Sequence, residues 1–335
     1  MSVLNVVLPL GSSVLSFVFA ALVLDQWWQR RHSFQLVWGI GLLWYGISAG
    51  TEFWGGAFGW SEPLYRTWYL IGAFFVAAYL GAGTIYLLAK TRFGYFAGAT
   101  VLIGGLLSLL FSHSARYPGA ATAGTVTFAI ALVGGIAIIA ATATRRQMAA
   151  HIAMGVLVIG SLGVANLVLT APLQPLAPGF ALDPNTHVPV GSAFPGYVRV
   201  LTGPFNIAGA LCLIFGAIYS AYIYMPKKRV LAARYAVLAV VVNFVASLPG
   251  ALTAFREGKL NSRVPATIAI ALGAFIPGLT SGLNRFGVTW SFFLGEFLGV
   301  LLIFVGFLVS EDVFRNVRVG SWSRRPTASL ESEAG

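Results

Sequence analysis

Two glutamates stand inside stretches that are otherwise almost wholly apolar. Glu52 lies near the end of residues 34–54, and Glu296 is the one ionisable residue of residues 291–309, SFFLGEFLGVLLIFVGFLV. A charged side chain at the centre of a hydrocarbon layer costs about 2.5–3.5 kcal/mol, so such a group needs a proton, a hydrogen-bonding partner or a counter-ion. The two acids are therefore the leading candidates for a ligand or ion site.

The surroundings of Glu296 indicate a close contact between two helices. Glu296 directly follows Gly295, and Gly299 and Gly306 continue a line of small residues that lets another helix approach. Two interpretations remain open. The carboxyl is either protonated and bonded to an Asn or Tyr across this contact, or it exchanges protons or binds a cation.

Residues spaced by seven form a polar and aromatic stripe on each of two neighbouring segments. The stripes consist of Trp38, Tyr45 and Glu52 in the second segment and of Tyr65, Gly72, Tyr79 and Tyr86 in the third. Glu52 and Arg66 flank the short stretch between the segments, which predicts an ion pair between them. The alternative is an outward-facing binding site lined by Tyr45, Glu52, Arg66, Trp68 and Tyr69.

Asparagines and proline–glycine pairs in other apolar runs add further candidates. Asn206 and Asn243 are expected to form hydrogen bonds between helices, the usual role of such residues. Pro249–Gly250 and Pro277–Gly278 are expected to interrupt their helices and to free backbone carbonyls for coordination of a solute. The candidates for a ligand or ion site are Glu296, Glu52, Arg66, Tyr45, Tyr79, Asn206 and Asn243.

Residue patterns typical of metal sites and of enzymes do not occur in the sequence. None of the four histidines has a second histidine or an acid three or four residues later; they are His32, His113, His151 and His187. The single cysteine, Cys212, rules out an intramolecular disulfide. We therefore expect no metal site, no cofactor and no catalytic activity.

The elements that position these residues are long apolar segments. Of 335 residues, 58% are hydrophobic and 9% are charged, against about 25% charged in soluble domains. Runs of about 20 apolar residues match a helix that crosses a hydrocarbon core roughly 30 Å thick. The ten runs are residues 3–24, 34–54, 67–89, 95–112, 124–143, 152–171, 200–224, 236–254, 264–283 and 288–310. They predict an all-α, polytopic transmembrane bundle of nine or ten hydrophobic segments.

Residues 1–310 are expected to form a single transmembrane helical domain with its N-terminus outside. The stretch 172–199 contains six prolines and is predicted to be an outer loop. The polar end, residues 311–335, is predicted to be a disordered tail.

Topology depends on whether residues 236–254 cross the membrane. With ten crossings, eleven Lys and Arg residues lie inside and ten outside. With nine, seventeen lie inside and four outside, which fits the retention of basic loops in the cytoplasm much better. We therefore favour nine crossings, with 236–254 re-entrant or tilted.

The net charge of +11 comes mainly from short basic clusters between apolar runs. This distribution is typical of cytoplasmic loops and does not indicate a nucleic-acid partner. The lipid bilayer of the inner (plasma) membrane is the expected environment. A small ligand and other membrane proteins remain as potential partners.

Three stretches carry a resemblance to known proteins. RRHSFQLVWGIGLLWYGISAGTEF (30–53), LYRTWYLIGAFFVAAYLGAGTIYLLAKTR (64–92) and GLNRFGVTWSFFLGEFLGVLLIFVGFLV (282–309) resemble a bacterial family of integral membrane proteins without an assigned activity. More distantly, the order of basic pair, Trp-containing helix, acid and aromatic helix is similar to the seven-helix sensor region of some bacterial histidine kinases. The chain departs from that pattern because it has no kinase and more helices.

Three functions are consistent with the sequence. The first is a membrane module that binds or senses a small ligand, with a site between segments 34–54, 67–89 and 200–224. The second is a transporter of a small solute, coupled to protons through Glu296. The third is a structural membrane subunit.

Overall fold

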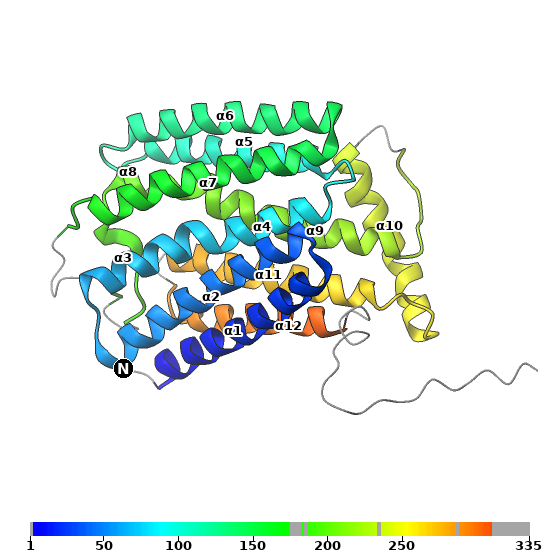
Figure 1. The fold of residues 1–335 in the computed structure, drawn as a ribbon, viewed down its shortest axis with the longest axis horizontal. Helices are drawn as coiled ribbons and strands as arrows, with labels where there is room; N and C mark the ends of the chain where they lie inside the picture. Colours follow the sequence, from blue (N-terminus) through cyan, green and yellow to red (C-terminus); the bar gives the residue numbers. More distant parts are fainter. Residues whose placement is uncertain (1–2, 175–181, 184–186, 233–235, 286–287, 310–335) are drawn as a thin grey trace, which may run out of the picture.

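The computed structural model describes residues 3–174, 182–183, 187–232, 236–285 and 288–309, and these form a helical bundle (Figure 1). The tail 311–335 and part of the proline-rich stretch lie outside the described residues. The elements are α1 (Leu4–Arg30), α2 (Ser33–Phe58), α3 (Glu62–Leu70), η1 (Ile71–Phe75), α4 (Val76–Leu87), α5 (Phe93–Ser112), α6 (Ala121–Thr144), α7 (Arg146–Thr170), η2 (Gly191–Ala193), α8 (Gly196–Arg199), η3 (Gly203–Ile207), α9 (Ala208–Tyr224), α10 (Ala236–Arg256), α11 (Arg263–Arg285) and α12 (Phe292–Val309).

Most of these helices have the dimensions and composition of membrane-spanning segments. Within the described residues, nine helices are long and apolar enough to cross a membrane. The α2 helix is not among the nine, although it lies inside the bundle between α1 and α4. Large apolar side chains such as Val133, Ile159 and Leu162 are about 70% exposed, as a lipid-facing surface requires. The all-helical character predicted from the sequence is therefore confirmed for the described residues, and the nine apolar helices fit a multi-pass membrane protein.

The helices are arranged in three groups (Figure 1). The α5, α6 and α7 helices lie together on one side, and α1, α2, α11 and α12 lie on the other. The α4 and α9 helices pack against each other between the two groups. A Cβ atom at Gly209 of α9 would overlap the backbone carbonyl of Ala77, so only glycine allows this close approach.

The α10 helix runs across one end of the bundle, at a steep angle to the other long helices (Figure 1). Tyr224, the last residue of α9, accepts a hydrogen bond at its hydroxyl from Nη1 of Arg263, the first residue of α11, at 2.7 Å. The helices before and after α10 therefore meet at the same end. Residues 236–256 thus do not run from one end of the bundle to the other, although residues 238–256 are among the nine helices long and apolar enough to cross a membrane. The number of crossings stays a prediction.

Basic residues gather at the end that α10 covers, which we call the basic end. The opposite end, where α1 begins, is the amino-terminal end. At this end, the following Lys and Arg residues of the described chain lie at a helix terminus or in the adjoining loop: Arg30, Arg31, Lys90, Arg92, Arg145, Arg146, Lys227, Lys228, Arg229, Arg256, Lys259 and Arg263.

The proline-containing helices are not interrupted, contrary to the expectation from the sequence. The α10 helix continues through Pro249, and α11 continues through Pro277. A helix tolerates proline when its neighbours accommodate the ring and other groups satisfy the freed backbone. Here Gly299 of α12 makes room for the ring of Pro277.

The irregular turns lie elsewhere, in η1 and η3, which are both π-helical. A π-helical turn carries one residue more than an α-helical turn and often occurs at functional sites. Each of the two turns interrupts a membrane-length helix, since α3, η1 and α4 form one continuous segment and α8, η3 and α9 another.

Candidate functional site

The two glutamates meet inside the bundle. Glu52 comes from α2 and Glu296 from α12, and their carboxyl groups interact directly. Glu52 is only 1% exposed. Its Oε1 accepts a hydrogen bond from Trp68 Nε1 at 2.7 Å. Residues 244 positions apart in the sequence thus form one carboxyl pair.

Two adjacent buried acids favour a proton between them. Oε2 of Glu52 has no hydrogen-bond partner among the described residues. Two carboxyl groups can bond each other only when one of them is protonated, because a carboxylate can only accept. Two adjacent buried charges of like sign would also repel each other strongly. Protonation of at least one of the two acids removes this repulsion.

Tyr45 fixes the backbone of α12 beside the pair. Its hydroxyl donates a hydrogen bond to the carbonyl oxygen of Glu296 at 2.8 Å. Tyr45 stands two turns before Glu52 on the same face of α2, as the sequence stripe predicted. The sequence interpretation expected an Asn or Tyr to bond the Glu296 carboxyl itself, whereas this tyrosine bonds its backbone and the second acid bonds its side chain.

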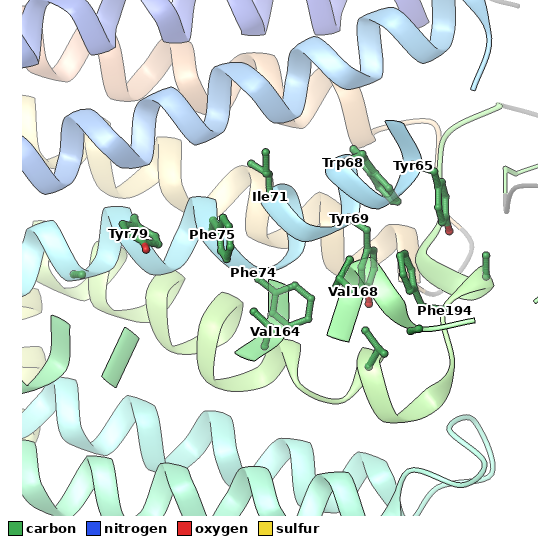
Figure 2. Packing of buried hydrophobic residues seen from close by; sticks show 14 of the residues in the cluster. Tyr65, Trp68, Tyr69, Ile71, Phe74, Phe75, Tyr79, Val164, Val168 and Phe194 are labelled. Atoms are coloured by element: carbon green, nitrogen blue, oxygen red, sulfur yellow. The ribbon is translucent and has the colours of Figure 1, made fainter. Parts of the chain in front are cut away.

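An aromatic cluster at the amino-terminal end holds Trp68 in place (Figure 2). Phe194 stacks on Tyr65 and Tyr69, with ring centroids 5.6 and 4.3 Å apart. The hydroxyl of Tyr65 donates to the carbonyl of Val190. The segment 187–194 is thereby fastened to α3, and the indole of Trp68 is left aimed at Glu52.

A central cavity of about 80 Å³ lies on the Glu296 side of the pair. Since about 10–15 Å³ of such volume is the minimum for one water molecule, the cavity has room for a few waters or one small solute. Its lining combines small and apolar residues with the polar side chains of Tyr45, Ser48, Asn206, Ser281 and Glu296. These residues come from α2, η3, α11 and α12.

Helix irregularities converge on this cavity. Gly72 of η1, Asn206 of η3 and Pro277 of α11 all belong to its lining. Pro277 has no backbone N–H, so the carbonyl of Gly273 loses its usual partner one turn earlier. Gly273 also lines the cavity. Interrupted backbone hydrogen bonding at membrane depth is tolerated where it borders a cavity, and it marks solute sites in transporters.

The sequence candidates divide into two sets. Glu52, Glu296, Tyr45 and Asn206 lie together at the pair and the cavity. The predicted region between segments 34–54, 67–89 and 200–224 does contribute to the cavity, but α11 and α12 complete its wall.

Arg66, Tyr79 and Asn243 lie elsewhere. The predicted ion pair between Glu52 and Arg66 is wrong, because Arg66 bonds Glu62 at 2.7 Å and the carbonyl of Val168 at 2.6 Å. Tyr79 donates from α4 to Ser161 of α7 at 3.4 Å. Asn243 bonds the backbone of Val230 and Leu231 and so holds the segment before α10.

Ser48 and Ser281 belong to the cavity but were not among the sequence candidates. Ser48 lies between Tyr45 and Glu52 at spacings of three and four, so helical periodicity could have identified it. Ser281 has no comparable signal in the sequence. In the part of the chain that the structure describes, no group of three or more His, Cys, Asp or Glu residues could hold a metal ion.

Comparisons with protein-family models, with curated proteins and with solved structures found no match for this chain.

Proposed function

We propose that this protein is an integral membrane carrier that couples the movement of a proton to the movement of a small polar solute. The observation that carries the proposal is the Glu52–Glu296 pair, two adjacent buried acids of which Glu296 lines the central cavity. Ionisable residues inside membrane segments typically mark proton and substrate pathways. The pair is the proton site, and the central cavity is the solute site.

The lining of the cavity favours particular solutes. It contains the Glu296 carboxyl and several hydroxyl and amide groups but no Lys or Arg side chain. An anion would meet a carboxyl group without a compensating cation, whereas a cation or a neutral polar molecule would find acceptors. We therefore expect a small cation or neutral solute rather than an anion.

The arrangement of the helices supports an orientation in the membrane. Lys and Arg residues are concentrated at the basic end, and such clusters are retained in the cytoplasm. The amino-terminal end then faces outward, and α10 lies along the cytoplasmic surface. A bacterial inner membrane is the proposed location, in line with the resemblance of residues 30–53 and 64–92.

A ligand-binding or sensing module is the second candidate, and the same cavity supports it. A sensor binds its ligand without net flux, whereas a carrier moves it across the membrane. A purely structural subunit needs neither the cavity nor a proton between two acids. Transport measurements separate the three functions.

The test uses the full chain reconstituted in liposomes that contain a pH-sensitive dye. A panel of amines, monovalent cations, amino acids and sugars is added under an imposed pH gradient, and proton entry is followed. We expect at least one solute to accelerate proton entry in the wild type. Glu52→Gln and Glu296→Gln should each reduce this coupled entry by about tenfold or more.

Glu257→Gln is the matched control, because Glu257 is an exposed glutamate that pairs with Lys259 at 2.9 Å. It should transport like the wild type. Solute binding without flux would assign the protein to the sensing class. Undiminished coupled flux in both pair variants would contradict the role given to the acids.

A further inference from the structure

A second, smaller pocket touches the same carboxyl pair from the other side. It has a volume of about 10 Å³, enough for one water molecule. Its lining is Asn5, Glu52, Gly56, Trp60, His187 and Phe293. These residues come from the first turns of α1, the last turns of α2, the start of α12 and the loops of the amino-terminal end.

The two acids divide the two spaces between them. Glu52 lines the small pocket but not the central cavity, and Glu296 lines the central cavity but not the small pocket. The carboxyl pair is thus the wall between a space at the amino-terminal end and a space in the middle of the bundle. A group that passes from one space to the other at this point must pass through the pair.

The small pocket is suited to a proton and to little else. Gly56 lies one turn after Glu52, and a Cβ atom there would stand 3.0 Å from the carbonyl oxygen of Asn5, so the missing side chain keeps the space open. Trp60 and Phe293 supply bulky walls. His187 is exposed and connects the lining to the surface. A solute is excluded by size, whereas a water molecule can hydrogen-bond to a carboxyl group.

The other titratable groups near the pair are few in the described part of the chain. Tyr45 of α2 faces Glu296, and His187 lines the small pocket. Glu62 and Arg66 of α3 bond each other instead. Neither lining contains a Lys, Arg or Asp residue.

We infer that the small pocket is the proton port of this protein: Glu52 exchanges protons with the amino-terminal side through one water beside His187, and Glu296 exchanges them with the central cavity. This inference rests on the proposed function, since it gives the carrier separate routes for proton and solute. In one transfer, hydronium in the pocket donates a proton to the Glu52 carboxylate, and the Glu296 carboxyl releases its proton to water in the cavity. The proton on Glu52 then passes to the adjacent Glu296 carboxylate, so the pair returns to its starting state and one proton has moved inward.

The test measures protonation of the pair directly, so it needs no identified solute. A protonated carboxyl group absorbs infrared light at a frequency distinct from that of a carboxylate. Proteoliposomes of the full chain receive a rapid acid step outside, and the growth of the carboxyl band is timed. Cys212→Ser removes the native thiol, and His187→Cys allows a bulky, membrane-impermeant thiol reagent to close the pocket in outward-facing copies.

We expect band growth to slow by on the order of tenfold in the labelled copies, because protons would then need a local opening of the bundle. The slowed fraction of the signal should equal the labelled fraction of the protein. His113→Cys is the control, since His113 is exposed at the same end, between α5 and α6, and its labelling should leave the rate unchanged. His187→Asn, which suits the left-handed backbone at this position (φ 56°), should also slow protonation without any reagent.

The proposed proton port would be contradicted by an unchanged rate of carboxyl protonation in labelled His187→Cys. It would also be contradicted by a wild-type rate in His187→Asn. The failure of the proposed function would look different. In that case the wild type and Glu52→Gln would show the same carboxyl band and no response to the acid step.

Discussion

At the scale of single residues, the central feature is an acid that is satisfied by another acid. Burial of a lone carboxylate is costly, and a partner with a positive charge is the common solution. This chain instead places Glu296 against Glu52, with the Trp68 indole as a further donor at 2.7 Å. Because two adjacent buried charges of like sign repel each other, the stability of such a pair depends on the ion that it is proposed to carry.

Trp68→Phe tests how much the stability of the pair depends on the hydrogen bond from the Trp68 indole to Glu52. The substitution keeps an aromatic ring in the cluster but leaves Oε1 of Glu52 without the indole hydrogen bond. Loss of a partner to a buried acceptor costs about 1–3 kcal/mol, so the free energy of unfolding should fall by that amount. Denaturant titration in detergent measures it.

Trp54→Phe is the control for this substitution, because Trp54 is 56% exposed. It should change the free energy of unfolding by much less. Equal effects of the two substitutions would show that the hydrogen bond to Glu52 contributes nothing to stability.

At the scale of elements, glycine contacts set the distances that create the cavity. The α4 and α9 helices contact each other at Gly81 and Gly209. Each helix begins directly after a π-helical turn, η1 with Gly72 before α4 and η3 with Asn206 before α9. In lipid, such contacts replace the hydrophobic effect as the force between helices. Separation of α4 from α9 would therefore change the cavity wall as well as the stability.

Gly209→Ala tests this contact. The added methyl group would overlap the carbonyl of Ala77, and overpacking of this kind costs about 1–3 kcal/mol. We expect a lower free energy of unfolding together with weaker coupled transport. The matched substitution is Gly155→Ala in α7, where a Cβ atom meets nothing within 4 Å. It should be neutral or slightly stabilising, and a similar loss in both variants would argue against a specific α4–α9 contact.

At the scale of the whole molecule, α10 decides the topology. Its polar residues Asn243 and Ser247 bond the backbone of residues 228–231, while Val245, Leu252 and Phe255 remain more than half exposed. Although α10 is apolar enough to cross a membrane, we propose that it lies along the membrane surface with its exposed apolar face toward lipid. The basic residues before and after it would then lie on one side.

Labelling of single cysteines tests this topology in the Cys212→Ser background. Arg229→Cys precedes α10, and Lys259→Cys follows it. Both should react with an impermeant thiol reagent from the same side as Arg146→Cys. His113→Cys should react from the opposite side. Reaction of positions 229 and 259 from opposite sides would show that α10 crosses the membrane.

Much of the architecture follows from the sequence. Runs of about 20 apolar residues predict helices, because a chain in hydrocarbon must satisfy every backbone hydrogen bond internally. The glycine line of Gly295, Gly299 and Gly306 predicts a close helix contact, and α11 provides it through Thr280, Pro277 and Ala266. The seven-residue spacing of Tyr45 and Glu52 correctly places both side chains on one face of α2.

The predictions from the sequence were wrong where a side-chain contact depended on which helices are neighbours in the folded protein. Glu52 and Arg66 are close in the chain, and a local pair was therefore predicted, but Arg66 points to α7 and bonds Val168. Pro249 and Pro277 were expected to interrupt helices, but α10 and α11 continue through them. Gly299 of α12 makes room for the ring of Pro277, and Pro249 is exposed. Asn243 belongs to α10 and to the end of the bundle, remote from the cavity.

By itself, then, the sequence determined that this is a helical protein with membrane-length apolar segments and two acids within them, because local composition and periodicity decide what an isolated segment can be. Only the tertiary structure decided that the two acids lie next to each other and line two different small spaces. That arrangement depends on packing between α2 and α12, and no local pattern encodes a contact across 244 positions of the chain.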